Sequence, residues 1–161
     1  MLFRRSIVGI LAPAAATQAS AHGPDHEMGG GTSGDAGKVA RVVEVVASDN
    51  EFSLKSLQVK EGETVRFVVR NDGLDPHEFL IDTKAAHAEH RQMMKAMMQQ
   101  QKQGGHAHAM AMDMHDSGVT VAPGKTASFA WTFARTPDLE FACDIPGHYE
   151  DGMRGPFTFS R

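Results

Sequence analysis

The sequence has little positive charge and no long apolar run. Lysine and arginine number 16 against 20 aspartates and glutamates, which gives a formal net charge of −4. A nucleic-acid partner would require a basic stripe, so that class of function is excluded, whereas a basic protein partner stays compatible with the charge. The apolar stretch at residues 7–16 is interrupted by Gly9 and Pro13 and is shorter than the ~20 residues of a membrane-spanning helix. We therefore expect no membrane span.

The N-terminal segment has the features of an export signal. Arg4 and Arg5 form a short basic region, the apolar stretch follows, and an Ala-Ser-Ala sequence ending at Ala21 fits the small-x-small rule for cleavage. We expect residues 1–21 to be a signal peptide that is cleaved after Ala21, with export to the periplasm. The alternative is a frayed N-terminal helix of a cytosolic protein.

Cysteine is also scarce, since Cys143 is the only one. Exported proteins usually carry cysteines in pairs that form disulfides, so a lone thiol in an oxidising compartment is a liability unless something occupies it. This favours a metal ligand at Cys143. Two other interpretations are a buried inert thiol and a nucleophile with His148 as its base, although no oxyanion motif or third catalytic residue accompanies them.

From Val39 onward the sequence is typical of a β protein. Short segments rich in β-branched and aromatic residues alternate with turn signals such as Asn71-Asp72-Gly73 and Pro123-Gly124. Short strands at steady spacing indicate an all-β sandwich or barrel, which would occupy residues 39–161 as a single domain. We expect strands at residues 41–46, 52–59, 64–70, 78–81, 119–121, 127–133, 139–143 and 156–159.

Two segments depart from this pattern. Residues 22–38 are rich in glycine, so we expect a flexible tail. Residues 84–118 form an insertion between two strands. Its first part is built from alanine, methionine, glutamine and lysine, and we expect a helix from about Lys84 to Gln103, which ends before Gly104-Gly105. The low-complexity remainder, residues 106–118, is expected to be a mobile loop.

The strongest chemical signal is a C-x4-H-x4-M motif formed by Cys143, His148 and Met153 between two expected strands. A thiolate, an imidazole and a thioether form a soft ligand set, which favours copper over magnesium, calcium or manganese. Zinc binds thiolate and imidazole but does not usually take a thioether. A trigonal site of two histidines and a cysteine, with a weak axial methionine, suits copper electron transfer. His77, just ahead of the strand at 78–81, is the natural second histidine.

In these residues the chain resembles the cupredoxins, the plastocyanin-like and azurin-like copper proteins, over residues 39–161 apart from the insertion. The motif spacing is similar to that of rusticyanin. The resemblance implies a Greek-key β-sandwich with a type 1 copper that cycles between Cu(II) and Cu(I), held by His77, Cys143, His148 and Met153. The tail and insertion resemble those of the exported copper-tolerance cupredoxins of Gram-negative bacteria, the CopI type.

One position departs from the family pattern. Many cupredoxins place asparagine directly after the first histidine ligand, where it ties the two ligand loops together, and here that residue is Glu78. A carboxylate at this position would alter the hydrogen bonding around the Cys143 sulfur and therefore the reduction potential. Whether the site is blue or green, meaning a more tetragonal copper, stays open.

The insertion and the tail carry further soft ligands. On the expected helix, residues three or four apart share a face, and thioethers bind Cu(I) without losing a proton. The alternative is that the methionines form a soft packing surface. The candidate accessory copper ligands of the insertion are His87, His90, Met94, Met97, Met98, His106, His108, Met110, Met112, Met114 and His115, with His90, Met93 and Met97 as an overlapping set on the helix. In the tail, His22 and His26 are candidates for an N-terminal copper site, against the alternative of a plain polar tail.

Three functions are compatible with these features. The first is a periplasmic copper-tolerance protein with cuprous oxidase activity, in which the type 1 centre oxidises Cu(I) to Cu(II) and passes the electron to oxygen or to a redox partner such as a c-type cytochrome. The second is a plain electron carrier of a respiratory or photosynthetic chain. The third is a copper store or chaperone without redox turnover. The extra soft ligands favour the first function, because a plain carrier has no use for them.

Overall fold

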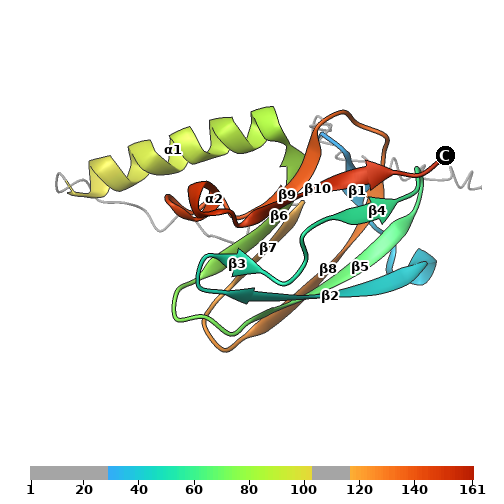
Figure 1. Cartoon of the computed structure of the whole chain (residues 1–161), viewed down its shortest axis with the longest axis horizontal. Helices are drawn as coiled ribbons and strands as arrows, with labels where there is room; N and C mark the ends of the chain where they lie inside the picture. The colour runs from blue at the N-terminus through green and yellow to red at the C-terminus, as the bar shows by residue number, and fades with distance from the viewer. Residues whose placement is uncertain (1–28, 103–116) are drawn as a thin grey trace, which may run out of the picture.

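The computed structural model of the chain describes residues 29–102 and 117–161, which form two five-stranded sheets packed face to face (Figure 1). The first sheet has the order β1 (Gly31–Ser33), β8 (Thr126–Phe133), β5 (Thr64–Asn71), β2 (Arg41–Ser48) and β3 (Glu51–Phe52). The second has the order β4 (Leu57–Val59), β10 (Arg154–Phe159), β9 (Leu139–Ala142), β6 (His77–Thr83) and β7 (Gly118–Val121). The expected all-β sandwich is confirmed.

Strand pairing is antiparallel except at two places, where β2 runs parallel to β5 and β4 runs parallel to β10. Parallel neighbours cannot be joined by a tight hairpin, so the chain must cross between the two sheets at these points. In the second sheet β6 pairs with both β7 and β9, and β9 pairs with β10. The start of β6 and the end of β9 therefore lie side by side at one end of the sandwich.

Aromatic side chains from both sheets fill the space between them. Phe67 on β5 lies 5.3 Å, centroid to centroid, from Phe79 on β6, and Phe79 stacks at 5.1 Å on Phe141 of β9. All three rings are fully buried, as is Trp131 on β8. Burial of each such side chain contributes about 1.5–3 kcal/mol, and the ring contacts add about 0.5–1.5 kcal/mol per pair. This packing anchors β6 and β9 against the opposite sheet.

Residues 22–38 were expected to be a flexible tail, but the part that the structure describes, residues 29–38, contains regular structure. Gly31–Ser33 form β1, which pairs with β8, and residues 36–38 form a 3₁₀ turn. Gly31 has a positive φ of 148°, and a Cβ atom there would collide with the Thr132 carbonyl and the Trp131 ring. The glycines that indicate flexibility in the sequence thus allow a close backbone approach in the fold.

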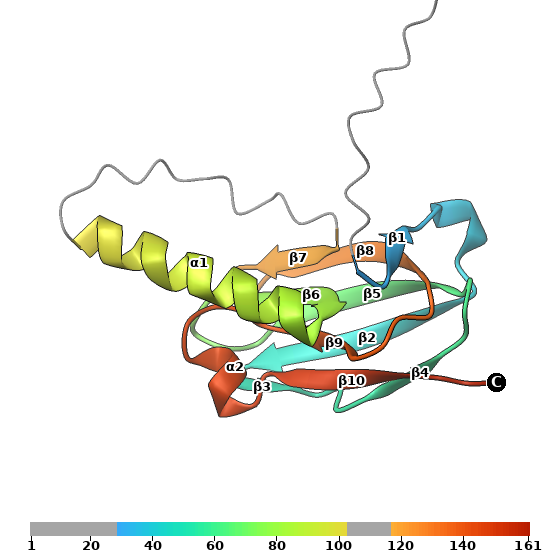
Figure 2. The same cartoon turned by 90° about the horizontal axis from the view of Figure 1, so that it is seen from above.

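The expected helix of the insertion is present as α1 (Lys84–Lys102) and continues directly from β6. The Thr83 hydroxyl accepts a hydrogen bond from the Ala86 amide (3.2 Å), which satisfies one of the amides left unpaired at the helix start. Both views show α1 extending beyond the sheets at the end where the one-turn helix α2 (His148–Asp151) lies (Figures 1 and 2). Within the described ranges, neither helix is long and apolar enough to cross a membrane.

Candidate metal centre

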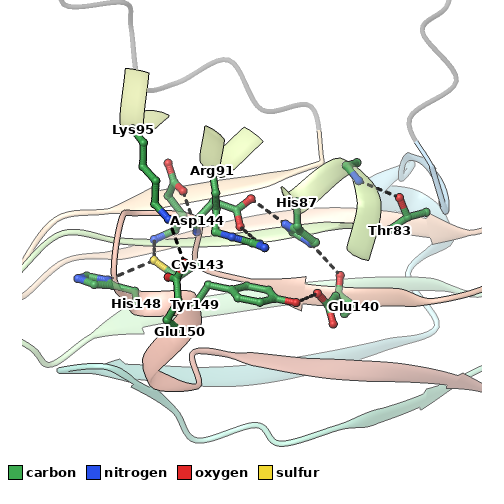
Figure 3. Close-up of polar contacts among 12 residues, drawn as sticks. Thr83, His87, Arg91, Lys95, Glu140, Cys143, Asp144, His148, Tyr149 and Glu150 are labelled. Atoms are coloured by element: carbon green, nitrogen blue, oxygen red, sulfur yellow. Dashed lines mark hydrogen bonds and ion pairs between the residues drawn. The ribbon is translucent and has the colours of Figure 1, made fainter. Parts of the chain in front are cut away.

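Three ligand-type side chains converge at the end of the sandwich where α2 lies. The Nδ1 atoms of His77 and His148 are 3.2 Å apart, and the Cys143 Sγ atom lies 3.4 Å from Nδ1 of His148. In the part of the chain that the structure describes, these residues form the one group of three or more histidine, cysteine or acidic side chains close enough to share a metal ion. Figure 3 shows Cys143 and His148 facing each other.

The strands and the loop between them determine this geometry. His77 is the first residue of β6, and Cys143 directly follows β9, its neighbour in the sheet. The Cys143 amide donates to the Met153 carbonyl (3.0 Å), and the Met153 amide donates to the His148 carbonyl (3.0 Å), so the loop from 143 to 153 closes on itself. Met153 is fully buried beside this closure. The loop turns at Gly147 and Gly152, whose positive φ angles of 101° and 108° suit glycine.

Burial controls the protonation of the site. Burial is the main cause that raises the pKa of the Cys143 thiol to about 12, and the nearby Glu78 and Asp144 carboxylates act in the same direction. The pKa of His77 is lowered, first by burial and then by the adjacent His148. The metal-free site therefore holds a protonated thiol beside a neutral imidazole. A protonated, buried thiol is a poor nucleophile, so the geometry does not support a Cys143–His148 catalytic pair.

The donor set fits copper. Two imidazole nitrogens and one cysteine sulfur lie within 4.8 Å of one another, and a buried thioether residue lies in the same loop. This combination of soft ligands is the one that copper electron-transfer sites use. Loops anchored by strands hold the ligands in place, so little has to move when the metal changes its oxidation state. Copper at these residues would supply a one-electron Cu(II)/Cu(I) couple.

Glu78, which occupies the position of the asparagine in many cupredoxins, connects the two ligand segments. Its backbone amide donates to Cys143 Sγ (3.4 Å), and its side-chain Oε2 accepts from the Asp144 amide (3.2 Å). Burial raises the pKa of Glu78 to about 7, and the neighbouring Asp144 carboxylate adds to this rise. The carboxyl group therefore makes a bridge of the kind that the family's asparagine makes, but with a group that can carry charge.

The accessory candidates on α1 lie in different surroundings. His87 is buried, and both its ring nitrogens contact oxygen atoms: Nδ1 donates to Asp144 Oδ2 (2.7 Å) and Nε2 donates to the Glu140 carbonyl (3.4 Å). This engagement leaves His87 without a ring nitrogen for a metal. His90 is half-buried and, with Met93, lines a pocket of about 320 Å³ that Asp82 and Asp144 also line. Met94 is half-buried, and Met97 and Met98 are exposed.

The remaining accessory candidates lie outside the described residues. These are His22 and His26 in the tail, and His106, His108, Met110, Met112, Met114 and His115 in the insertion. Their role in copper binding stays a prediction.

Sequence reasoning missed the polar residues that surround the ligand loop. Asp144 is completely buried and contacts both His87 and Arg91 of α1, with Arg91 Nη1 3.3 Å from Asp144 Oδ1. The Tyr149 hydroxyl donates to the Glu140 carboxylate (2.6 Å). In the sequence, the only sign of these contacts is that His87 and Arg91 are four residues apart and therefore share a face of the helix. This spacing does not reveal that Asp144 is their acidic partner.

The fold and the ligand geometry together define a mononuclear copper site in a β-sandwich. Residues 39–160 match the family of copper binding proteins described as the plastocyanin/azurin family. The chain belongs to this family, so the expected type 1 copper site at His77, Cys143, His148 and Met153 is supported by ancestry as well as geometry.

Two relatives show which members of this family the chain is similar to. The chain is 39% identical to the copper-resistant cuproprotein CopI of Pseudomonas aeruginosa, over 94% of this chain and 92% of that protein. It is 42% identical to the protein of the same name from Rubrivivax gelatinosus, over 85% of this chain and 77% of that protein. The resemblance to the CopI type that the tail and insertion predict is confirmed.

Solved structures show the same fold at lower sequence identity. Auracyanin B superposes with a TM-score of 0.62 at 20% identity, covering 83% of this chain and 97% of that structure. The azurin Az-iso2 of Methylomonas sp. strain J superposes with a TM-score of 0.51 at 16% identity, covering 76% of this chain and all of that structure (100%). These two comparisons support the sandwich architecture.

Proposed function

We propose that this chain is a periplasmic copper-tolerance protein that oxidises Cu(I) to the less toxic Cu(II). The observation that carries the proposal is the convergence of His77 Nδ1, His148 Nδ1 and Cys143 Sγ on one point, which is a one-electron centre once copper is bound. The relatives named copper-resistant cuproproteins support a role in tolerance. The export signal expected at residues 1–21 supports the periplasm, where the mature chain would begin at His22.

In the proposed reaction the substrate is a second copper ion. Copper held by His77, Cys143, His148 and Met153 would supply the one-electron oxidant for the substrate Cu(I), which would leave as Cu(II). Oxygen or a redox partner such as a c-type cytochrome would take up the electron. The chain's own residues keep the ligand geometry constant, because β6, β9 and the closed loop from 143 to 153 hold the donors.

The soft ligands outside the centre would collect the substrate. His90 and Met93 line the pocket beside α1, and the six histidines and methionines between residues 106 and 115 follow in the same insertion. The tail residues His22 and His26 would bind Cu(II) with the new α-amine after cleavage. His87 is not a ligand in this proposal, because Asp144 and Glu140 occupy its nitrogens.

The test is anaerobic addition of one equivalent of Cu(I) to the copper-loaded protein. We expect the thiolate-to-copper absorption band to bleach, and to return on admission of oxygen or an oxidised cytochrome. Ascorbate is the control, because it must bleach the band in any redox-competent centre. A centre that ascorbate bleaches and Cu(I) does not would overturn the proposal.

A variant separates collection from electron transfer. Serine substitution of the histidines and methionines at 106, 108, 110, 112, 114 and 115 keeps the chain length and leaves α1 intact. We expect the band to remain, the number of bound copper ions to fall, and copper tolerance of cells that depend on this protein to drop. Unchanged tolerance with fewer bound ions would contradict the role of the insertion.

A second candidate function, plain electron transfer, is favoured by one observation. Leu74 is 84% exposed in the loop that leads to His77, so an apolar side chain faces solvent close to a ligand. Such a residue suits transient docking of a redox partner. Rapid electron exchange with a cytochrome, together with no response to Cu(I), would favour this function over the first.

A further inference from the structure

The buried carboxylate of Asp144 lies at the junction between the copper ligands and the inserted helix. Asp144 directly follows Cys143 and is 0% exposed. Its backbone amide donates to Glu78 Oε2, and the Glu78 amide donates to Cys143 Sγ. The residue after the thiolate ligand is therefore tied back to the sulfur through Glu78.

The side chain of Asp144 is held from the other side by α1. His87 donates from Nδ1 to Oδ2 at 2.7 Å, with both side chains only 1% exposed, and Arg91 lies 3.3 Å from Oδ1. Figure 3 shows both side chains of α1 converging on Asp144. The hydrogen bonds at both nitrogens of His87 correspond to its doubly protonated form, so the carboxylate faces two cationic groups.

Further contacts keep α1 against the loop. The Arg91 guanidinium lies over the Tyr149 ring, 3.5 Å from its centroid, and Tyr149 is adjacent to the ligand His148. At the surface, Lys95 pairs with Glu150 at 3.1 Å, but both side chains are half exposed, so this pair contributes little to holding the helix. His87, Arg91 and Lys95 are four residues apart on one face of the helix, so this whole face meets the ligand loop.

A buried carboxylate without compensating partners is strongly disfavoured, because desolvation penalises its charge. Asp144 therefore cannot turn away from His87 without leaving a buried charge unpaired. Since the backbone of Asp144 continues into Cys143, this restraint also limits the directions that the Cys143 side chain can take.

We propose that His87 and Arg91 are positioning residues for the copper centre, which act through Asp144 to set the orientation and the electrostatic environment of the Cys143 thiolate. The inserted helix is then a structural part of the centre as well as a carrier of soft ligands. This inference rests on the copper site at His77, Cys143, His148 and Met153, and does not depend on Cu(I) oxidation.

Two consequences follow for a copper-loaded protein. Loss of the His87 donor would let the 143–144 peptide shift, which changes the overlap between the sulfur and the metal. It would also leave the negative charge of Asp144 less compensated near the metal, which favours Cu(II) over Cu(I) and lowers the reduction potential. A residue that only stabilises the fold would produce neither effect in the folded protein.

The experiment uses the full chain loaded with copper and compares the thiolate-to-copper absorption, the EPR copper hyperfine splitting and the reduction potential. His87→Leu removes both donors at similar volume, and His87→Asn keeps an amide donor near the position of Nδ1. Arg91→Gln is the milder variant, because Arg91 is only half-buried. This variant should fold even if His87→Leu does not. Lys95→Gln is the matched control, because it removes a positive charge from the same helix face at an exposed pair.

We expect His87→Leu to change the absorption and hyperfine pattern and to lower the potential, with Arg91→Gln acting in the same direction and more weakly. His87→Asn should recover most of the wild-type spectrum, and Lys95→Gln should match the wild type. The inference is overturned if the folded His87→Leu and Arg91→Gln proteins bind copper with the spectrum and potential of Lys95→Gln. A wild-type protein without a thiolate band would refute the copper site itself, whereas a normal band that Cu(I) does not bleach would refute only the proposed function.

Discussion

The Nδ1 atoms of His77 and His148 lie 3.2 Å apart although 71 positions separate the two residues in the sequence. His77 reaches this place because it starts β6, and His148 because it starts α2 in the loop that leaves β9. The pairing of β6 with β9 thus builds the site from two distant segments. Mutations that disturb this pairing should weaken metal binding even where they touch no ligand.

Copper uptake should release a proton from Cys143. The pKa of the thiol is about 12 in the metal-free protein, so the group is protonated at pH 8, where histidine imidazoles are ordinarily neutral. Binding requires the thiolate. Titration of Cu(II) into weakly buffered protein at pH 8 should release about one proton per copper at the type 1 site, as followed by an indicator dye. Cys143→Ser should lose both the thiolate band and this proton, and equal proton release in both proteins would contradict the assignment.

The metal-free protein should lose stability as the pH rises above neutral, because of His87. Burial disfavours the charged form, but the hydrogen bond to Asp144, the Asp144 charge and the Glu140 carbonyl outweigh it and raise the pKa of His87 above its usual 6.5. The native state then holds this proton more tightly than the unfolded chain. The contribution is fully present below about pH 6.5 and is lost as the pH rises through the raised pKa.

The pH dependence of the His87 contribution can be measured by urea unfolding of the metal-free wild type and the His87→Asn variant at about pH 6 and pH 9. The difference in free energy of unfolding between the two proteins should be larger at the lower pH. Glu78 titrates in both proteins, so the comparison isolates the change caused by the loss of His87, which includes the effect of the His87 charge on the pKa of Glu78. A constant difference would show that His87 has no linkage to pH, and a difference that grows with pH would show the opposite linkage; either result contradicts the prediction.

Tyr149→Phe should destabilise the metal-free fold. The tyrosine hydroxyl donates to the buried Glu140 carboxylate at 2.6 Å, and removal of the donor leaves this acceptor desolvated. Hydrogen bonds to charged groups contribute about 1.5–3 kcal/mol, and we expect a loss of this size in the free energy of unfolding. The ring contact with Arg91 is retained by phenylalanine. Chemical denaturation measures the change, and a loss below about 0.5 kcal/mol would mean that water replaces the hydroxyl without cost.

Gly31→Ala should also destabilise the protein, because β1 needs glycine at this position. The positive φ and the contact with the Thr132 carbonyl leave no room for a methyl group, so strain of about 1–3 kcal/mol is expected. Gly37→Ala is the control, since an added Cβ there would meet only the Asp35 carboxylate at 3.4 Å. Thermal unfolding of the two variants should differ. Equal stability would show that residues 29–38 add nothing to the sandwich.

The ligand loop could be predicted from the sequence because its chemistry is local. Cys143, His148 and Met153 lie within eleven consecutive residues, and the alternation of apolar residues marks the strands on either side. Helix α1 was predictable for the same reason, since its composition favours a helix over residues 84–102 irrespective of its neighbours. His77 was predicted by its place before a strand, and the pairing of β6 with β9 brings it to the other two.

Only the tertiary structure decided what these elements contact. The helical spacing placed His87 on one face with His90 and Met94, which made a metal ligand a reasonable expectation, but the partner across that face is Asp144, 57 positions away. In the same way Gly31 is indistinguishable from a flexible glycine until Thr132 lies against it. A sequence determines propensity and local chemistry, because both act over a few residues. Burial and charge pairing depend on segments that meet only after the chain has folded.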